Sequence, residues 1–250
     1  STVFLNIEEK INGWKPAVIN QWGLPNRISD YSVDTRQRSF SFSGVTYKVP
    51  FILRVGMSVD PLLCYLPQVL EGFNRRYPHT RVTVVEDGPE GLLARLRNCE
   101  LDLAVSSLNG AAGGADLAMQ ALKSERFSLY QGGDLTAAGQ PPAEAKWVVP
   151  RSCSVGHAAI REIAERYTPH GQIVETDSFL ATWCLVRQQG YIALLSDRVV
   201  AHYAPQLHLQ KIPTQGIDIS ARFYVFTRHE PATPPLSAAF IHLLQTLQTG

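Results

Sequence analysis

The sequence lacks the features that mark membrane proteins and disulfide-stabilised secreted domains. No apolar run approaches the roughly 20 residues of a membrane-spanning helix, and no charged-then-apolar leader opens the chain, which begins at Ser1. The cysteines are far apart and form no C-x-x-C pair; they are Cys64, Cys99, Cys153 and Cys184. We therefore expect a cytoplasmic protein that does not contact the membrane and whose thiols are free and buried.

The sequence also lacks an excess of one charge. It has 23 basic and 22 acidic residues, a formal net charge of +1, and only short basic clusters such as Arg75-Arg76. Proteins that read DNA usually carry a basic patch or stripe. We therefore expect this chain, by itself, to bind no specific duplex DNA.

Signatures of catalysis, cofactors and metals are missing as well. The sequence contains no G-x-S-x-G, and no P-loop or G-x-G-x-x-G follows a predicted strand. The seven histidines are scattered and provide no paired metal ligands at helical spacing. We therefore expect no enzymatic activity, no cofactor and no bound metal.

The first 50 residues differ in pattern from the rest of the chain. They hold Trp14 and Trp22, little helical periodicity and several helix-breaking residues. Alternating segments at 38–42 and 45–49 flank Ser43-Gly44, which predicts a β-hairpin. This atypical N-terminal segment, residues 1–50, indicates no particular function.

From residue 51 onward the pattern is that of an α/β protein. Asp60-Pro61 predicts a helix N-cap followed by proline at the first helical position, and Pro78 ends this helix. The apolar stripe of the helix comprises Leu62, Leu66, Val69, Leu70, Phe73 and Tyr77. Strands are expected at 52–56, 81–85 and 101–105, with a short helix around Leu92, Leu93 and Leu96. This alternation predicts right-handed crossovers and a parallel sheet.

The alternation restarts near Lys146, after a strand at 122–130 that crosses out of the first lobe. The second lobe is expected to have strands at 146–149, 172–175 and 191–195, and helices that begin near Ser154, near Asp177 or Ser178, and near Ser196. A strand at 221–226 and a helix at 237–247 return to the first lobe. The predicted fold class is α/β, with two Rossmann-like lobes and an interlobe ligand cleft. Lobe I comprises about residues 51–125 and 220–250, and lobe II about residues 126–219.

Five phrases of this region carry a family resemblance when they are taken together. They are Leu53-Arg-Val-Gly-Met-Ser58, Leu66-Pro-Gln-Val-Leu-Glu-Gly-Phe-Asn-Arg-Arg-Tyr-Pro78, Leu101-Asp-Leu-Ala-Val105, Glu175-Thr-Asp-Ser-Phe-Leu-Ala-Thr-Trp-Cys-Leu-Val186 and Gly190-Tyr-Ile-Ala-Leu-Leu195. In order and spacing the region resembles the effector-binding (substrate-binding) domain of LysR-type transcriptional regulators. The resemblance implies a type 2 periplasmic-binding-protein-like fold, a small-molecule effector, and a homodimeric or homotetrameric transcription factor.

The N-terminal segment departs from the family pattern. LysR-type regulators normally begin with a winged helix-turn-helix followed by a long linker helix. Residues 1–50 show no alanine-rich helix-turn-helix pattern and no long helical stripe. We therefore expect that DNA is bound only through a domain absent from this chain.

Three predicted strand-to-helix turns can face the expected cleft, at residues 57–60, 150–154 and 176–179. Each ends at a helix N-terminus, where free N–H groups and the positive end of the helix dipole favour an anion. Serine hydroxyls and the Arg151 guanidinium suit a small organic acid. The candidate ligand-binding residues are Ser58, Val59, Asp60, Ser106, Ser107, Arg151, Ser152, Cys153, Asp177, Ser178, Phe179 and Tyr203.

These residues also have structural interpretations, and two other functions stay open. Asp60 and the serines before helices suit plain N-caps, Arg151 suits a surface ion pair, and Tyr203 suits packing. A thiol-based redox sensor is one alternative, because Cys153 lies one helical turn before His157. A solute-binding protein of a transport system is the other, because that class has the same two-lobed fold.

Overall fold

The structure, a computed structural model, describes most of the chain from residue 51 onward. The described residues are 31–34, 39–42, 45–48, 51–108, 115–132, 145–151, 157–168, 171–203, 209–213, 219–229 and 234–247. The candidate residues Ser152 and Cys153, and the predicted helix start at Ser154, lie outside them. The chain divides into two compact units, Ser1–Ile52 with His79–Arg81, and Leu53–Pro78 with Val82–Gly250.

In the first unit, three strands form an antiparallel sheet. They are β1 (Tyr31–Asp34), β2 (Ser39–Phe42) and β3 (Val45–Lys48). Strands β2 and β3 pair with Phe42 opposite Val45, at the place where the sequence predicts a hairpin around Ser43-Gly44. Strand β1, which pairs with β2, has no counterpart among the predicted strands.

A second sheet has nine strands in the order β5-β4-β6-β12-β7-β10-β8-β9, with β11 paired to β7. Its strands are β4 (Phe51–Met57), β5 (Thr80–Glu86), β6 (Leu103–Ser107), β7 (Leu117–Gly132), β8 (Lys146–Val149), β9 (Gln172–Glu175), β10 (Ile192–Ser196), β11 (Leu209–Ile212) and β12 (Ile219–Arg228). Parallel pairs join β4 to β6 and β8 to both β9 and β10, as βαβ crossovers require.

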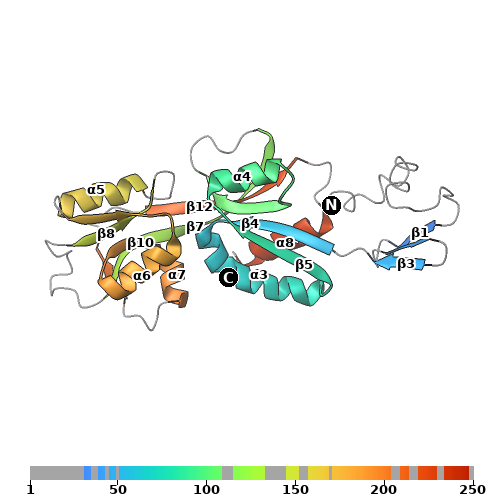
Figure 1. Cartoon of the computed structure of the whole chain (residues 1–250), viewed down its shortest axis with the longest axis horizontal. Coiled ribbons are helices and arrows are strands. Elements are labelled where there is room, and N and C mark those ends of the chain that lie inside the picture. The colour runs from blue at the N-terminus through green and yellow to red at the C-terminus, as the bar shows by residue number, and fades with distance from the viewer. Residues whose placement is uncertain are drawn as a thin grey trace. The chain divides into compact units, whose positions relative to one another are not determined.

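Two long strands, β7 and β12, run through both lobes of this sheet. They pair with each other antiparallel, and their register shifts between Arg222 and Tyr224. In lobe I, residues 223–226 of β12 also pair with β6 along the other edge of the strand, and in lobe II residues 127–131 of β7 pair with β10. In Figure 1 the lobe II elements α5, β8, β10 and α6 lie at one end of the two strands, and α3, α4 and α8 at the other. The two predicted lobes are therefore present, although their hydrogen bonding is continuous through the crossing strands.

Six helices of the described residues cover this sheet. Lobe I carries α3 (Val59–Arg76), α4 (Pro89–Arg97) and α8 (Pro235–Thr246), and lobe II carries α5 (His157–Tyr167), α6 (Phe179–Gln189) and α7 (Asp197–Tyr203). The predicted return of the C-terminal helix to lobe I is confirmed, because the Phe240 ring of α8 meets the Phe73 ring of α3 edge-on at 5.6 Å. Helix α6 ends, as predicted, at Gly190, whose φ of 67° is the left-handed conformation that glycine adopts without strain.

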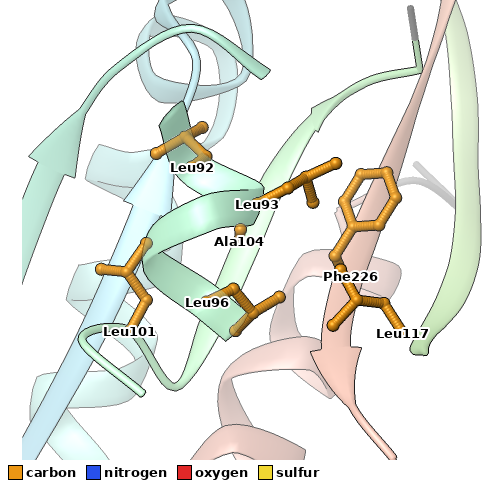
Figure 2. Packing of buried hydrophobic residues seen from close by; sticks show 7 residues of the cluster. All are labelled: Leu92, Leu93, Leu96, Leu101, Ala104, Leu117 and Phe226. Atoms are coloured by element: carbon orange, nitrogen blue, oxygen red, sulfur yellow. The ribbon is translucent and has the colours of Figure 1, made fainter. Parts of the chain in front are cut away.

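The core of lobe I lies between α4 and the sheet. Leucines from one face of α4 pack against side chains of β6, β7 and β12 (Figure 2). The cluster comprises Leu92, Leu93, Leu96, Leu101, Ala104, Leu117 and Phe226, all buried. The i, i+1, i+4 spacing of the three α4 leucines places them on one face, as the sequence predicts.

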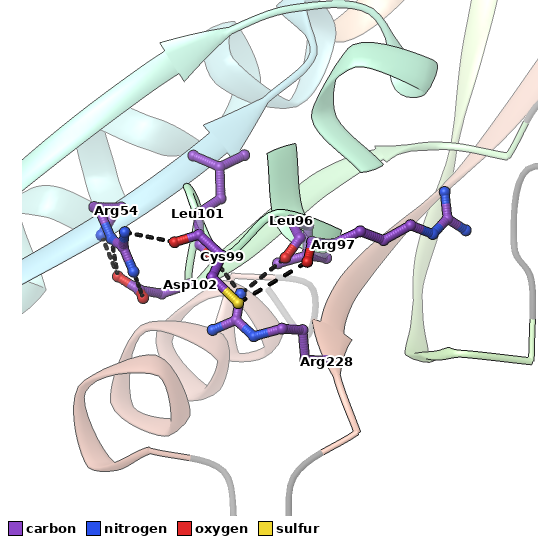
Figure 3. Close-up of polar contacts among 7 residues, drawn as sticks. All are labelled: Arg54, Leu96, Arg97, Cys99, Leu101, Asp102 and Arg228. Carbon is purple, nitrogen blue, oxygen red and sulfur yellow. Dashed lines mark hydrogen bonds and ion pairs between the residues drawn. The ribbon is translucent and has the colours of Figure 1, made fainter. Parts of the chain in front are cut away.

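Two arginines hold the connection between α4 and β6 in place (Figure 3). The Arg54 guanidinium forms an ion pair with Asp102 at 2.7 Å and donates to the carbonyl of Cys99, also at 2.7 Å. Arg228 donates to the carbonyl oxygens of Leu96 and Leu101. These bonds supply donors to carbonyl oxygens of the last turn of α4 and of the segment that joins it to β6.

The start of α3 differs from its prediction. The N-cap is Ser58 rather than Asp60, because the Ser58 carbonyl already accepts the N–H of Leu62 at 3.0 Å. Asp60 is the second residue of the helix, and Pro61 the third, where a missing N–H costs no helical bond. The buried face is also rotated from the predicted leucine stripe: it comprises Pro61, Cys64, Tyr65, Val69 and Phe73.

The expectation of buried thiols is correct for one of the three cysteines that the structure describes. All three are free, and Cys64 is buried, but Cys99 and Cys184 are exposed. Cys99 lies in the turn after α4 with a φ of 59°, and Cys184 lies on the outer face of α6. Apolar neighbours in the sequence are therefore not enough to predict that a cysteine is buried, because burial depends on which face of the element meets the core.

Candidate functional site

Two buried hydroxyls lie next to each other at the carboxyl ends of neighbouring parallel strands. Met57 of β4 is in register with Val105 of β6, and the N–H of Ser58 donates to the Val105 carbonyl at 3.0 Å. Ser58 and Ser106 follow these two residues. The Oγ atoms of both serines are buried and have no hydrogen-bond partner in the described part of the chain. Because burying an unpaired hydroxyl is unfavourable, two of them side by side indicate a place for the polar atoms of a ligand.

The N-terminus of α3 adds donors to this place. Ser58 is its N-cap, with extended backbone, but its side chain makes no capping hydrogen bond. The N–H groups of the first helical turn therefore keep their capacity to bind an anion, and the helix dipole favours one there.

A carboxyl group stands beside these donors. Asp60 lies two residues after Ser58 in the first turn of α3 and is partly buried. Burial raises the pKa of Asp60 to about 6, and the negative charge of Glu125 adds to this effect. The predicted role of Asp60 as an N-cap is wrong, and the residue is instead a carboxyl group near a second carboxyl.

Glu125 belongs to a polar cluster that joins the lobes. The Tyr65 hydroxyl of α3 donates to Glu125 of β7, and the Arg198 guanidinium of α7 lies 3.4 Å from the same carboxylate oxygen. The guanidinium also stacks over the Tyr65 ring, 5.0 Å from its centre. We call these residues the Tyr65–Glu125–Arg198 cluster. Its members are absent from the sequence-derived site because no local pattern links residues so distant along the chain.

Cys64 lies beside this cluster and is not an activated thiol. Burial raises its pKa to about 12, with the negative charges of Glu125 and Asp60 adding to the effect and a hydrogen bond with Ser196 opposing it. The thiolate is the nucleophilic form, so this side chain is unreactive at neutral pH.

The predicted turns of lobe II have internal partners. The Arg151 N–H donates to Asp177 Oδ1 at 2.9 Å, and its guanidinium lies 3.9 Å from Asp177 Oδ2, with both side chains exposed. The Ser178 hydroxyl accepts from the N–H of Ala181 at 3.2 Å, which is the predicted capping bond of α6. The Phe179 ring stacks on Trp183 at 5.6 Å.

The remaining candidate residues lie in both lobes. Val59 is the first residue of α3, and Ser107 is buried at the end of β6, opposite Phe223 of β12. The Tyr203 hydroxyl of α7 donates to the Leu63 carbonyl of α3 at 2.8 Å. The structure therefore places Ser58, Asp60, Ser106 and Ser107 in lobe I, and Arg151, Asp177 and Ser178 in lobe II.

The described residues offer less evidence for a metal site, a membrane-spanning helix or a ligand site in a surface pocket. No cluster of three His, Cys, Asp or Glu side chains there could hold a metal ion, and none of the described helices is long and apolar enough to cross a membrane. A surface pocket on β7, β12 and α8 is lined by Ala121, Leu122, Lys123, Ser124, Arg222 and Gln245. Its polar groups are partnered: Arg222 donates to Ser124, and Gln245 donates to Gln120.

Comparison with known proteins identifies the family. Residues 52–248 match the family model of the LysR substrate binding domain. The chain belongs to this family. The match covers both lobes and begins just after the N-terminal segment, which confirms the resemblance that the five sequence phrases carry.

Solved structures of LysR-type proteins share the fold of this LysR substrate-binding domain. The regulatory domain of CcmR from Synechocystis, in complex with 2-PG, has a TM-score of 0.65 and 19% identity over 80% of this chain and 98% of its own. The BenM effector binding domain with its effector benzoate has a TM-score of 0.62 and 14% identity over 81% of this chain and 94% of its own. Full-length CbnR in complex with its target DNA has a TM-score of 0.60 and 14% identity over 80% of this chain and 71% of its own.

A short stretch also matches a protein of another kind. It is 38% identical over 63 residues to phosphoglycerol transferase I of Escherichia coli, which is 25% of this chain. The chain spans only 8% of the length of that transferase. A match of this extent does not assign the chain to the transferase family.

Proposed function

We propose that this chain is the effector-binding domain of a LysR-type transcriptional regulator and holds a small, carboxylate-bearing effector between its lobes. The observation that carries the proposal is the pair of buried, unpartnered hydroxyls of Ser58 and Ser106 beside the N-terminus of α3. Hydroxyls and helical N–H groups can donate to a carboxylate without bringing a counter-charge of their own. From lobe II, Arg151, Ser152, Cys153, Asp177, Ser178 and Phe179 would contact the same effector.

Three proteins of similar fold support this choice of function. The solved CcmR and BenM domains are complexes with 2-PG and benzoate, and CbnR is a complex with target DNA. We infer that the present chain controls DNA binding through a separate helix-turn-helix domain, as a cytoplasmic homodimer or homotetramer without catalytic activity. Sedimentation of the purified chain, and titration of its four thiols in denaturant without reductant, test the assembly and the compartment.

Removing either hydroxyl should weaken effector binding without destabilising the free protein. A lost hydrogen bond to a charged group costs about 1.5–3 kcal/mol, so Ser58→Ala or Ser106→Ala should weaken affinity by about tenfold or more. Because neither Oγ atom has a partner among the described residues, the unliganded melting temperature should stay nearly unchanged. A thermal-shift screen of small carboxylates that includes benzoate finds the ligand, and calorimetry on the variants measures the affinity.

Thr168→Val is the matched control for these variants. Its hydroxyl is buried, like that of Ser106, but accepts a hydrogen bond from the Trp147 indole at 2.6 Å in lobe II. This variant should lose about 1–3 kcal/mol of stability and keep its affinity. Serine variants that lose stability instead of affinity would show that Ser58 and Ser106 are structural.

The chain by itself should not bind specific duplex DNA. Its basic and acidic residues nearly balance, and the solved relative that is bound to DNA is a full-length protein. Fluorescence anisotropy with a pool of labelled duplexes should therefore give weak binding that is independent of sequence and abolished by moderate salt. Sequence-selective binding by these 250 residues would contradict the proposal.

A further inference from the structure

The proposed anion site has a carboxyl group at its edge. Asp60 lies in the first turn of α3, two residues beyond Ser58, and a helix rises only about 1.5 Å per residue. Within the described part of the chain, no hydrogen-bond donor or cation contacts its carboxyl group. The charge that does act on it is the negative one of Glu125.

Among the described residues, the two arginines placed at this site already have carboxylate partners. Arg198, on the lobe II side, pairs with Glu125 at 3.4 Å and stacks on the Tyr65 ring. Arg151, which would contact the effector from lobe II, is paired with Asp177, so these two side chains together bring no net charge. The N-terminus of α3 offers about half a positive charge, which is less than the combined charge of a bound carboxylate and an ionised Asp60.

The charges around Ser58 therefore do not suit a ligand that is only an anion. A carboxylate bound by the Ser58 and Ser106 hydroxyls would lie at the start of α3, whose first turn also carries the Asp60 carboxylate, and like charges placed in this way repel. A metal ion could not relieve the repulsion, because the described residues hold no cluster of three acidic, histidine or cysteine ligands. A positively charged group on the ligand itself would relieve it.

We propose that the effector is a zwitterion, whose carboxylate is bound by Ser58, Ser106 and the N-terminus of α3 and whose ammonium group pairs with Asp60. Small amino acids are the simplest ligands of this class. The proposal rests on the proposed function and narrows it, because it assigns a second charged group to the effector. It also gives the unpartnered carboxyl of Asp60 a specific role.

Matched pairs of ligands test the zwitterion. Each pair combines an amino acid with the acid that has hydrogen in place of the amine: L-phenylalanine with 3-phenylpropionate, L-leucine with 4-methylpentanoate, and L-2-aminoadipate with adipate. Calorimetry on the full chain at neutral pH should show at least one amino acid that binds about tenfold or more tightly than its partner acid. Asp60→Asn should reduce that preference to about threefold or less, and Asp116→Asn, which removes an exposed carboxylate paired with Arg97, should leave it unchanged.

The outcomes separate this proposal from the proposed function. Partner acids that bind as tightly as the amino acids, and gain affinity in Asp60→Asn, would overturn the ammonium contact while leaving a carboxylate effector in place. Failure of both members of every pair to bind would overturn both proposals. If 2-phenylethylamine, which has no carboxylate, binds as tightly as L-phenylalanine, the result would support the ammonium contact with Asp60 and overturn the proposal that the effector is bound through a carboxylate.

Discussion

Replacing Phe226 by alanine should lower the free energy of unfolding by about 3–5 kcal/mol, the range observed for large aromatic residues in cores. Phe226 is fully buried and meets the α4 leucines across the core of lobe I (Figure 2). Its strand, β12, pairs with both β6 and β7. The cavity would therefore open where α4 packs on the strand that connects the lobes.

Urea unfolding of the wild-type chain and the variant measures this loss. Leu180→Ala is the control, because it also removes a large apolar side chain but one that is 71% exposed. A surface substitution of this kind should change stability by less than about 0.5 kcal/mol. Equal effects of the two substitutions would contradict the packing of α4 on β12.

Replacing Asp60 by asparagine should remove a pH-dependent cost of folding. The folded protein raises the pKa of Asp60 from 3.8 to about 6, through burial and the charge of Glu125. Below about pH 4 the group is protonated in the folded and unfolded chain alike, and its full contribution to stability is present. As the pH rises through 6 the folded chain must hold a carboxylate in an unfavourable place. Each tenfold change in proton affinity corresponds to 1.36 kcal/mol, so the wild-type chain should lose about 2–3 kcal/mol of stability over this pH range.

The difference between wild-type and Asp60→Asn stability, followed by urea unfolding from pH 4 to 7, isolates this effect. The free energy of unfolding of Asp60→Asn should increase relative to that of the wild type as the pH rises. When Glu125→Gln is also present, this increase should be smaller, because the charge that repels the Asp60 carboxylate is removed. The other titratable groups that the structure describes at this place, Cys64, Tyr65 and Arg198, are unchanged in both variants. In Asp116→Asn the sign should reverse, because the Arg97 hydrogen bond lowers the pKa of Asp116 and stabilises the folded chain at high pH. A stability difference that stays constant with pH would show that Asp60 is not perturbed.

The two Asp60 experiments are linked. The Asp60 carboxyl is expected to lower the stability of the free protein and to raise its affinity for an ammonium group. This combination is typical of a functional residue. Asp60→Asn should therefore be more stable than the wild type at neutral pH and a poorer binder of zwitterions.

Much of the architecture could be predicted because it follows from local patterns. The strands at 146–149 and 172–175 match β8 and β9 residue for residue, since each is a short segment with two adjacent β-branched residues next to a breaker, Pro150 or Gly171. The cap of α6 at Ser178 and its end at Gly190 depend on one side chain and one backbone angle. Strand β11 is missing from the prediction, because four residues that pair only with β7 carry little signal of their own.

The candidate site was only partly predictable. Ser58 and Ser106 were predicted because each follows a buried strand, and the carboxyl ends of parallel strands meet at one edge of a sheet. The start of α3 was misplaced by two residues, because Ser58, Asp60 and Pro61 all suit a helix N-terminus and only the backbone bond from Leu62 to Ser58 decides between them.

Sequence periodicity and turn chemistry were enough for the α/β class, the two lobes and the family, because these depend on residues close to one another along the chain. Whether a polar group has a partner was decided only by tertiary structure. The Arg151–Asp177 pair and the Tyr65–Glu125–Arg198 cluster join residues from different elements. The same packing leaves Ser58, Ser106 and Asp60 without partners among the described residues, since the free energy of a charge or a hydroxyl depends on all the groups that surround it in space.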